Sequence, residues 1–394
     1  MSDGVSVSAP TNGGRSRINV AKPWLGEEEI AAVTEAIRSG WVAQGPRVAA
    51  FEAKFAGLVG AEHAVALSNC TTALHLALVV AGVGAGDEVV VPSFSFIATT
   101  NAPVYVGARP VFADVDADTG NLSVETIAPV VTAATKAVIL VHQGGVPADA
   151  ASVRAFCEPR GIVVIEDAAC AAGSRWQGAP VGRGAAIAAW SFHPRKLITT
   201  GEGGMLTTDD AQWAQRARRL REHAMSVSAA ERHQSVLPPE EQYLEVGYNY
   251  RMTDLQAAVG LVQLDRLAPI VARRREIVAG YQQALGEVPG LRVLRDPAGG
   301  ESNFQSFWVE VLPEFPLDRE GLLAHLAEAG ISARRGIMAA HRQPAYAAQP
   351  GAALPVTDRL TENTLILPVF HEMTADEIDR VVAAVRAAAA VVTV

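Results

Sequence analysis

One lysine stands among polar residues that follow an apolar run. In the stretch AAWSFHPRKLITTGEGGMLTTDD, residues 188–210, Lys196 comes after Ser191 and His193 and before a glycine-rich bend. Lysine occurs only four times in the 394 residues, at positions 22, 54, 136 and 196. A partly apolar setting lowers the pKa of an amine and favours imine formation with an aldehyde. Lys196 is therefore a candidate for covalent chemistry, and the alternative is a solvated surface lysine.

A carboxylate and a pair of threonines lie at the ends of other apolar runs. Asp167 closes IVVIED, where a carboxylate can pair with a cationic heterocyclic nitrogen. Thr71 and Thr72 begin the helical stretch TTALHLALVV, where free backbone N–H groups favour a phosphate. Helix capping is the alternative for both sites.

Aromatic and hydroxyl side chains are the remaining candidate site residues. Phe94 and Phe96 alternate in VPSFSF, so we expect them to face the same way, with one free to stack on a planar ring. Ser191 can offer its hydroxyl to the same phosphate as the threonines. His142 closes AVILVHQ, and a lone histidine at such a place is more often structural. A phosphate anchor, an aromatic side chain, a carboxylate and a lysine, in that chain order, fit the parts of pyridoxal 5'-phosphate.

Alternating strands and helices must position these residues. From about residue 47, amphipathic helical patterns alternate with short β-branched runs such as DEVVVPS, KAVILVHQ, IVVIEDA and IAAWSF. Strands with few polar residues between helices predict a mostly parallel sheet covered on both faces. The carboxyl ends of such strands are where ligand-binding residues collect.

The chain length predicts a large domain and a smaller one. We expect a disordered tail over residues 1–17, a large cofactor-binding domain over 18–268 and a small C-terminal α+β domain over 269–394. The tail is rich in Ser, Gly, Pro and Asn and has no apolar signal core, which favours a cytoplasmic protein.

Composition and missing motifs exclude several classes of function. The net charge of −9 and the absence of a long Lys/Arg block argue against nucleic-acid binding. No apolar run reaches the roughly 18 residues of a membrane span. Three cysteines, at 70, 157 and 170, are too few and too scattered for a disulfide framework or a four-ligand zinc site, so we expect no metal. GVGAGD follows a helix rather than a strand, which is the wrong order for a dinucleotide site.

The sequence resembles the DegT/DnrJ/StrS family of pyridoxal-phosphate sugar aminotransferases. The resemblance covers nearly the whole chain, through GWVAQGPRVAAFEAKFA, GDEVVVPSFSFIATTNAPVYVGARPVFADVD, IEDAACAAGS, WSFHPRKLITTGEGGMLTTDD, EVGYNYRMTDLQAAVGLVQLDRL and RRGIMAAHRQPAY. It implies an α/β protein of the fold type I aminotransferase architecture, with a mostly parallel seven-stranded sheet in the large domain.

The resemblance also implies roles for individual residues. Lys196 would bond covalently to the cofactor aldehyde and later move a proton between cofactor and substrate. Asp167 would keep the pyridine nitrogen protonated, and Phe96 would stack on the ring. The phosphate would be held by Thr71, Thr72 and Ser191.

Family relatives also suggest how subunits combine. Asn249, in GYNYR, matches a residue that in relatives reaches the phosphate of the neighbouring subunit. The resemblance therefore implies a homodimer with shared sites. Its substrates would be small molecules, an amino donor and a keto-sugar.

The chain departs from the family pattern at three places. Cys70 stands where relatives commonly have glycine, and Cys170 where they often have Gln or His. HQGG, which begins at His142, replaces the usual aromatic–glycine version. These differences leave the contacts near the cofactor's phosphate and 3-hydroxyl open.

Several functions remain as hypotheses. The leading one is transfer of an amino group from glutamate or glutamine to a keto-sugar on a nucleotide diphosphate, whose charge would meet Arg195, Arg251, Arg335 or the GWVAQGP loop. A keto-cyclitol acceptor is the closest alternative. A non-catalytic cofactor-binding regulatory protein and a hydrolase using Ser191 and His193 are two others.

Overall fold

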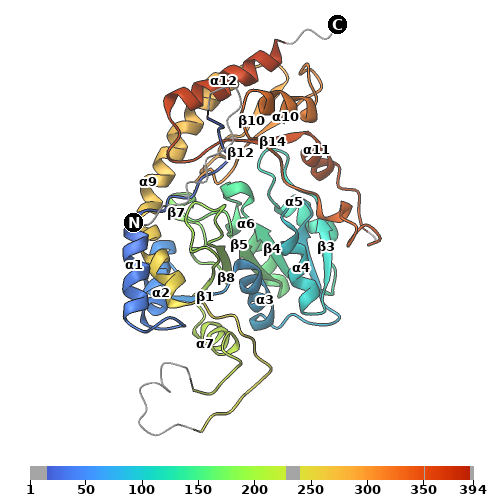
Figure 1. Cartoon of the computed structure of the whole chain (residues 1–394). Coiled ribbons are helices and arrows are strands. Elements are labelled where there is room, and N and C mark those ends of the chain that lie inside the picture. The colour runs from blue at the N-terminus through green and yellow to red at the C-terminus, as the bar shows by residue number, and fades with distance from the viewer. Residues whose placement is uncertain (1–15, 228–239, 350, 391–394) are drawn as a thin grey trace.

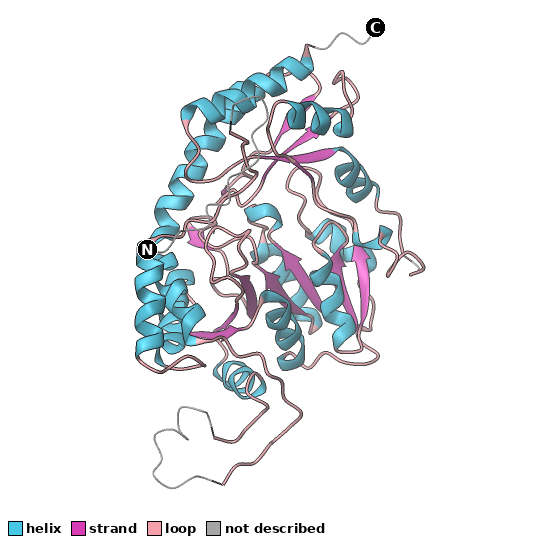
Figure 2. Ribbon diagram, viewed as in Figure 1, coloured by secondary structure: helices cyan, strands magenta, loops and turns pink. Residues whose placement is uncertain are grey.

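A mixed, mostly parallel sheet forms the centre of the larger α/β unit (Figures 1 and 2). The computed structural model describes residues 16–227, 240–349 and 351–390. The strand order is β1-β9-β8-β5-β4-β2-β3, and β9 runs antiparallel to both of its neighbours while the other four pairs are parallel. The strands are β1 His63–Leu67, β2 Glu88–Pro92, β3 Arg109–Ala113, β4 Thr135–Val141, β5 Val163–Asp167, β8 Ile187–Ser191 and β9 Gly204–Thr208.

Helices cover both faces of this sheet. Along β4, Ile139 packs into the apolar cluster that includes α3, whereas its neighbours Val138 and Leu140 pack into the cluster that includes α6. Successive side chains of a strand point to opposite faces, so both faces need apolar residues. The helices of this part of the chain are α1 Glu27–Arg38, α2 Pro46–Val59, α3 Cys70–Val80, α4 Ile97–Tyr105, α5 Val124–Ile127, α6 Ala150–Cys157 and α7 Ala211–Leu220.

A smaller α+β unit lies beyond the carboxyl ends of the parallel strands (Figure 1). Its four-stranded sheet has the order β10-β12-β14-β13, and its core contains Phe307, Leu365 and Val381. In a separate three-stranded sheet, β11-β6-β7, residues 300–301 pair with residues 175–176 of the larger unit. The remaining elements are β6 Arg175–Trp176, β7 Ala179–Pro180, β10 Leu291–Val293, β11 Gly300–Glu301, β12 Phe307–Val311, β13 Arg334–Arg335, β14 Thr364–Leu367, α10 Arg319–Glu328, α11 Pro355–Asn363 and α12 Ala375–Ala389.

One long helix, α9 Asp254–Leu285, connects the two units. The predicted domain boundary lies between residues 268 and 269, but the helix continues through Pro269. A proline inside a helix removes one hydrogen bond, at a cost of about 3 kcal/mol. Packing against α1, α2 and α12 offsets this cost. The predicted boundary thus falls inside a continuous helix, and the division into domains stays a prediction.

The link between β3 and β4 and the start of the chain complete the fold. Between β3 and β4 the chain forms only α5 and a 3-10 turn that contains Pro129. Residues 1–15 of the expected tail lie outside the described residues, while Arg17 donates a hydrogen bond to Ser332 and Ile18 is buried in the small unit's core. Among the described residues, α9 is long and apolar enough to span a bilayer by length and composition, but it packs in the protein as a core helix.

Candidate functional site

Asp167 is a buried carboxylate at the end of β5. Only 5% of the residue is exposed. Its Oδ2 accepts a hydrogen bond of 2.9 Å from the Thr99 hydroxyl, and Oδ1 accepts one of 3.2 Å from the Ala169 backbone N–H. Burial raises the pKa of Asp167 above its ordinary value, while these two donors and the positive charge of Lys196 oppose that rise. The expected capping contact exists, but the segment that follows is a turn rather than a helix.

Lys196 follows β8, the strand beside β5. Its Nζ donates to Cys170 Sγ at 3.0 Å, so this amine is not a solvated surface group. Burial lowers the pKa of Lys196, but the Cys170 sulfur, Cys70 and Asp167 outweigh burial and raise the pKa above its ordinary value. The sequence suggested a lowered pKa. That expectation was wrong because it counted the apolar surroundings and not the sulfur.

A second group of residues lies at the N-terminus of α3. Thr71 and Thr72 line a cavity of about 520 Å³ together with His193. The Thr72 hydroxyl donates to the Asn69 carbonyl at 2.7 Å, and the Thr72 N–H donates to Asn69 Oδ1 at 2.9 Å, so Thr72 takes part in the helix cap. The unpaired N–H groups of a helix N-terminus still make this cavity favourable for an anion.

Phe94 and Phe96 do not face the same way. Phe94 is buried with 1% exposure, whereas Phe96 is 70% exposed and forms the N-cap of α4. The alternation rule applies only within a strand, and β2 ends at Pro92. Phe96 is therefore the aromatic ring left free to meet a ligand, and Phe94 belongs to the core.

The HQGG stretch positions the turn that carries Cys170. His142 is buried, accepts a hydrogen bond from the Ala148 N–H at Nδ1 and contacts Glu166 through Nε2. At Gly145, φ is +95° and a Cβ would lie 1.9 Å from Asn303 Oδ1. The Asn303 amide donates to the Cys170 carbonyl at 2.8 Å. His142 is thus structural, and Gly145 leaves room for a side chain from the small unit that holds the turn.

The hydrolase hypothesis finds no support in the contacts of Ser191 and His193. Ser191 Oγ lies 3.4 Å from the backbone N–H of His193, which donates to it, and His193 Nδ1 accepts from the Arg195 N–H. Neither hydrogen bond joins the His193 ring to the Ser191 hydroxyl, as a general base would require.

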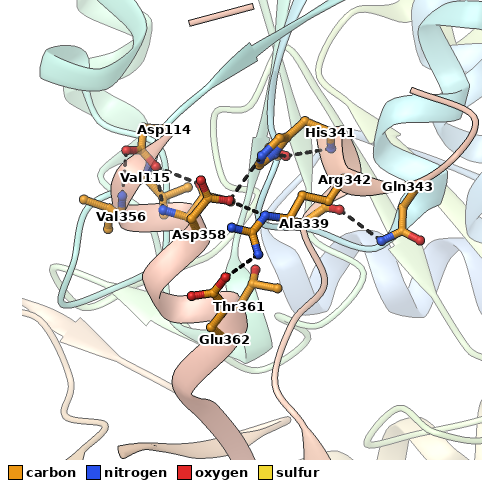
Figure 3. A network of polar contacts seen from close by, with 12 residues as sticks. Asp114, Val115, Ala339, His341, Arg342, Gln343, Val356, Asp358, Thr361 and Glu362 are labelled. Carbon is orange, nitrogen blue, oxygen red and sulfur yellow. Dashed lines mark hydrogen bonds and ion pairs between the residues drawn. The ribbon is translucent and has the colours of Figure 1, made fainter. Parts of the chain in front are cut away.

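A serine, a histidine and an aspartate do come together elsewhere. His341 Nδ1 lies 2.7 Å from Ser93 Oγ, and His341 Nε2 lies 3.2 Å from Asp358. Figure 3 shows Asp358 between His341 and Arg342. Ser93 is fully buried and also accepts from the His341 N–H, so it cannot attack a substrate. The group instead attaches the residue that follows β2 to the segment between β13 and β14 of the small unit.

The remaining predicted residues lie in different places. Asn249 is exposed and pairs through its backbone with Glu222. Arg335 is exposed and forms an ion pair with Glu320, while Arg195 lines a cavity of about 160 Å³ that also contains Lys196. Arg251 forms a backbone bridge with Leu67, and in the GWVAQGP loop the Gln44 amide contacts Glu222.

Sequence reasoning missed two residues of this site, Thr99 and Asn303. Thr99 lies three residues into a helix that follows a strand, but Asp167 is 68 residues away in the chain and no local pattern links the two. Asn303 lies 133 residues from Cys170, and no local pattern links the two.

Most of the chain matches a known family. A model of the DegT/DnrJ/EryC1/StrS aminotransferase family matches residues 23–386. The chain belongs to this family. Membership confirms the predicted enzyme class, and the structural matches below confirm the predicted fold class.

Three solved structures are similar to this aminotransferase. TlmJ, an aminotransferase from Streptoalloteichus hindustanus, is 38% identical, with a TM-score of 0.87 over 94% of this chain and 98% of that one. Spr1654 from Streptococcus pneumoniae, described as a sugar aminotransferase in its PMP form, is 28% identical, with a TM-score of 0.89 over 94% and 99%. DesI, solved in the presence of its TDP-sugar product, is 33% identical, with a TM-score of 0.87 over 95% and 93%.

The contact between Lys196 and Cys170 has a measurable consequence. Replacing Cys170 with alanine removes the sulfur that raises the pKa of Lys196, so the amine becomes neutral at lower pH. Reductive methylation of the cofactor-free protein at a series of pH values, followed by peptide mass spectrometry, should show the Lys196 profile shifted to lower pH. Cys157→Ala, in α6, is the matched control. An unchanged profile in Cys170→Ala would contradict the assignment.

Proposed function

We propose that this aminotransferase binds pyridoxal 5'-phosphate and moves an amino group from glutamate or glutamine to a keto-sugar carried on a nucleotide diphosphate. The observation that carries the proposal is the arrangement of Asp167 and Lys196. Asp167 ends β5, and Lys196 follows the neighbouring parallel strand β8, so both lie at the edge of the sheet formed by the carboxyl ends of these strands. Asp167 is buried, and Lys196 is partly buried. Ligands of open α/β sheets bind at this edge.

The residues present fit the cofactor. The cavity at Thr71 and Thr72 has the chemistry of a phosphate site, and Phe96 offers an uncommitted ring. Within the described part of the chain, Asp167 Oδ1 accepts only a long backbone hydrogen bond, which leaves it with capacity for a ring N–H. When bound, the cofactor supplies an aldehyde and an electron-accepting ring. Ser191, at the end of β8, would add a hydroxyl to the phosphate.

Each of these residues has a definite task in the proposal. Asp167 holds a proton on the ring nitrogen by staying ionised. Lys196 supplies the amine that carries protons to and from the substrate carbon. Thr71, Thr72 and the N-terminus of α3 orient the phosphate, and the exposed Phe96 restricts the ring to one plane.

An anionic substrate would find positive charge beside Lys196. Arg195 and Arg334 line the same cavity of about 160 Å³ as the lysine. Burial and the nearby Arg195 both lower the pKa of Arg334. Two guanidinium groups that repel each other gain free energy from an anion between them. This favours Arg195 over Arg335, which is paired with Glu320, as a contact for the diphosphate or a donor carboxylate.

The comparisons favour the sugar over the cyclitol. DesI was solved with its TDP-sugar product, and Spr1654 is described as a sugar aminotransferase. An enzyme that aminates a keto-cyclitol would hold the cofactor with the same residues, and so would a regulatory protein that binds the cofactor without turnover. The acceptor, or the lack of one, distinguishes these functions.

Turnover assays on the purified protein with bound cofactor test this proposal. We expect amino transfer from glutamate or glutamine to a nucleotide-linked keto-hexose. We expect a loss of at least about a thousandfold in Lys196→Ala because the amine acts in the chemical step. Product is measured by liquid chromatography and mass spectrometry. Turnover of a keto-cyclitol but of no nucleotide keto-sugar would refute the acceptor, and absence of any amino transfer would refute the enzyme.

We also propose that the protein is a homodimer in which Asn249 completes the partner's phosphate site. Large apolar side chains are exposed near Asn249, with Val246 at 85% and Tyr243 at 63%, and Phe96 is exposed as well. Contiguous exposed apolar residues are typical of interaction surfaces. A two-fold dimer places the same patch on both subunits.

Mixed dimers distinguish shared sites from separate ones. If Asn249 acts across the interface, a dimer of one Lys196→Ala chain and one Asn249→Ala chain contains one site with both residues intact. We expect such dimers to regain activity and full cofactor retention at half of the sites, whereas each parent dimer remains defective. Failure of the mixture to exceed its parents would show that the sites are not shared.

A further inference from the structure

Two buried hydroxyl groups line up behind Asp167. Ser95 Oγ lies 2.8 Å from Thr99 Oγ1, and Thr99 Oγ1 lies 2.9 Å from Asp167 Oδ2. Ser95 is 2% exposed and Thr99 is 1% exposed, so water does not compete for these bonds. Thr99 lies in the first turn of α4, and Ser95 comes just before the exposed N-cap residue Phe96.

The direction of each hydrogen bond follows from proton counting. A hydroxyl has one proton, and the Thr99 proton is directed at Asp167 Oδ2. The contact between Ser95 and Thr99 can therefore be made only with Ser95 as the donor. Both O–H dipoles then point towards the carboxylate. Hydrogen bonds that donate in one direction along a chain strengthen one another.

We propose that Ser95 and Thr99 are positioning residues that hold Asp167 in its ionised form and in one orientation, with Oδ1 turned to the ring nitrogen of the cofactor. This inference rests on the proposed function, because it assigns Asp167 as the partner of that nitrogen. Thr99 fixes Oδ2, and the Ala169 N–H restrains Oδ1 more weakly at 3.2 Å. The carboxylate therefore cannot rotate without losing its stronger donor.

The electrostatic balance explains why such donors are needed. Burial alone favours the neutral acid and raises the pKa of Asp167. The charged and titratable groups that act on it are Lys196, His142 and the Cys70 thiol. The Thr99 bond is the foremost influence that opposes burial. Without it, a proton shared between the ring nitrogen and Asp167 would move towards the carboxylate.

The chain supplies a matched control for this idea. Thr100 follows Thr99 in α4 and is fully buried, but its hydroxyl has no hydrogen-bond partner among the described residues. Thr99→Val and Thr100→Val make the same chemical change one residue apart. Only the first removes a donor to Asp167. Thr99→Ser restores the donor and serves as the rescue variant.

The first measurement uses the holoenzyme. Nitrogen-15 NMR of bound pyridoxal 5'-phosphate labelled at the ring nitrogen reports whether that nitrogen carries a proton. In Thr99→Val we expect the resonance to move towards the neutral pyridine position and kcat to fall roughly ten- to hundredfold, the range for loss of a hydrogen bond to a charged group. Thr100→Val and Thr99→Ser should resemble the wild type, and Ser95→Ala should shift in the same direction by less. An unshifted resonance in Thr99→Val, or an equal shift in Thr100→Val, would overturn the proposal.

A second measurement separates this inference from the proposed function. Carbon-13 NMR of labelled aspartate in the cofactor-free protein follows the titration of Asp167 directly, with Asp167→Asn used to assign the signal. We expect a higher pKa in Thr99→Val than in the wild type and no change in Thr100→Val. Cofactor that fails to bind would refute the proposed function while this titration still tests the hydroxyl chain. An Asp167 pKa that is unchanged in Thr99→Val would refute the hydroxyl chain itself.

Discussion

The burial of one negative charge constrains the rest of this site. Asp167 lies at the end of a strand that is covered on both faces, and a carboxylate there stays ionised only if donors and positive charge replace the lost water. Thr99, the Ala169 N–H and Lys196 supply that replacement. Each comes from a different segment, so the sheet, the start of α4 and the loop after β8 must be arranged together for the charge to be tolerated.

The small unit takes part in the same arrangement. Asn303 binds the turn that carries Cys170, and the Gln305 amide donates to the Arg195 carbonyl at 2.6 Å. His341 is bonded to Ser93 at the other end of the sheet's carboxyl edge. These three contacts connect the small unit to the segments that hold Lys196, Cys170 and Phe96. A displacement of the small unit would therefore move the segments that form the site.

The sequence was sufficient for features that depend on local pattern. Strands such as Val163–Asp167 are apolar up to their last two residues because both of their faces are buried, and this pattern predicted the sheet and the position of Asp167 and Lys196 at its edge. Features that depend on tertiary contacts were not predictable. The continuity of α9 through Pro269 and the raised pKa of Lys196 both depend on neighbours distant in the chain. The contacts that Thr99 and Asn303 make also depend on tertiary structure.

The central claim is that the amine of Lys196 bonds to an aldehyde whose ring nitrogen faces Asp167. The most direct measurement is peptide mapping by mass spectrometry after the protein has been incubated with pyridoxal 5'-phosphate and reduced with borohydride. The account predicts one reduced cofactor adduct per chain, on the peptide that contains Lys196. An adduct on Lys22, Lys54 or Lys136 instead, or no adduct at all, would contradict it.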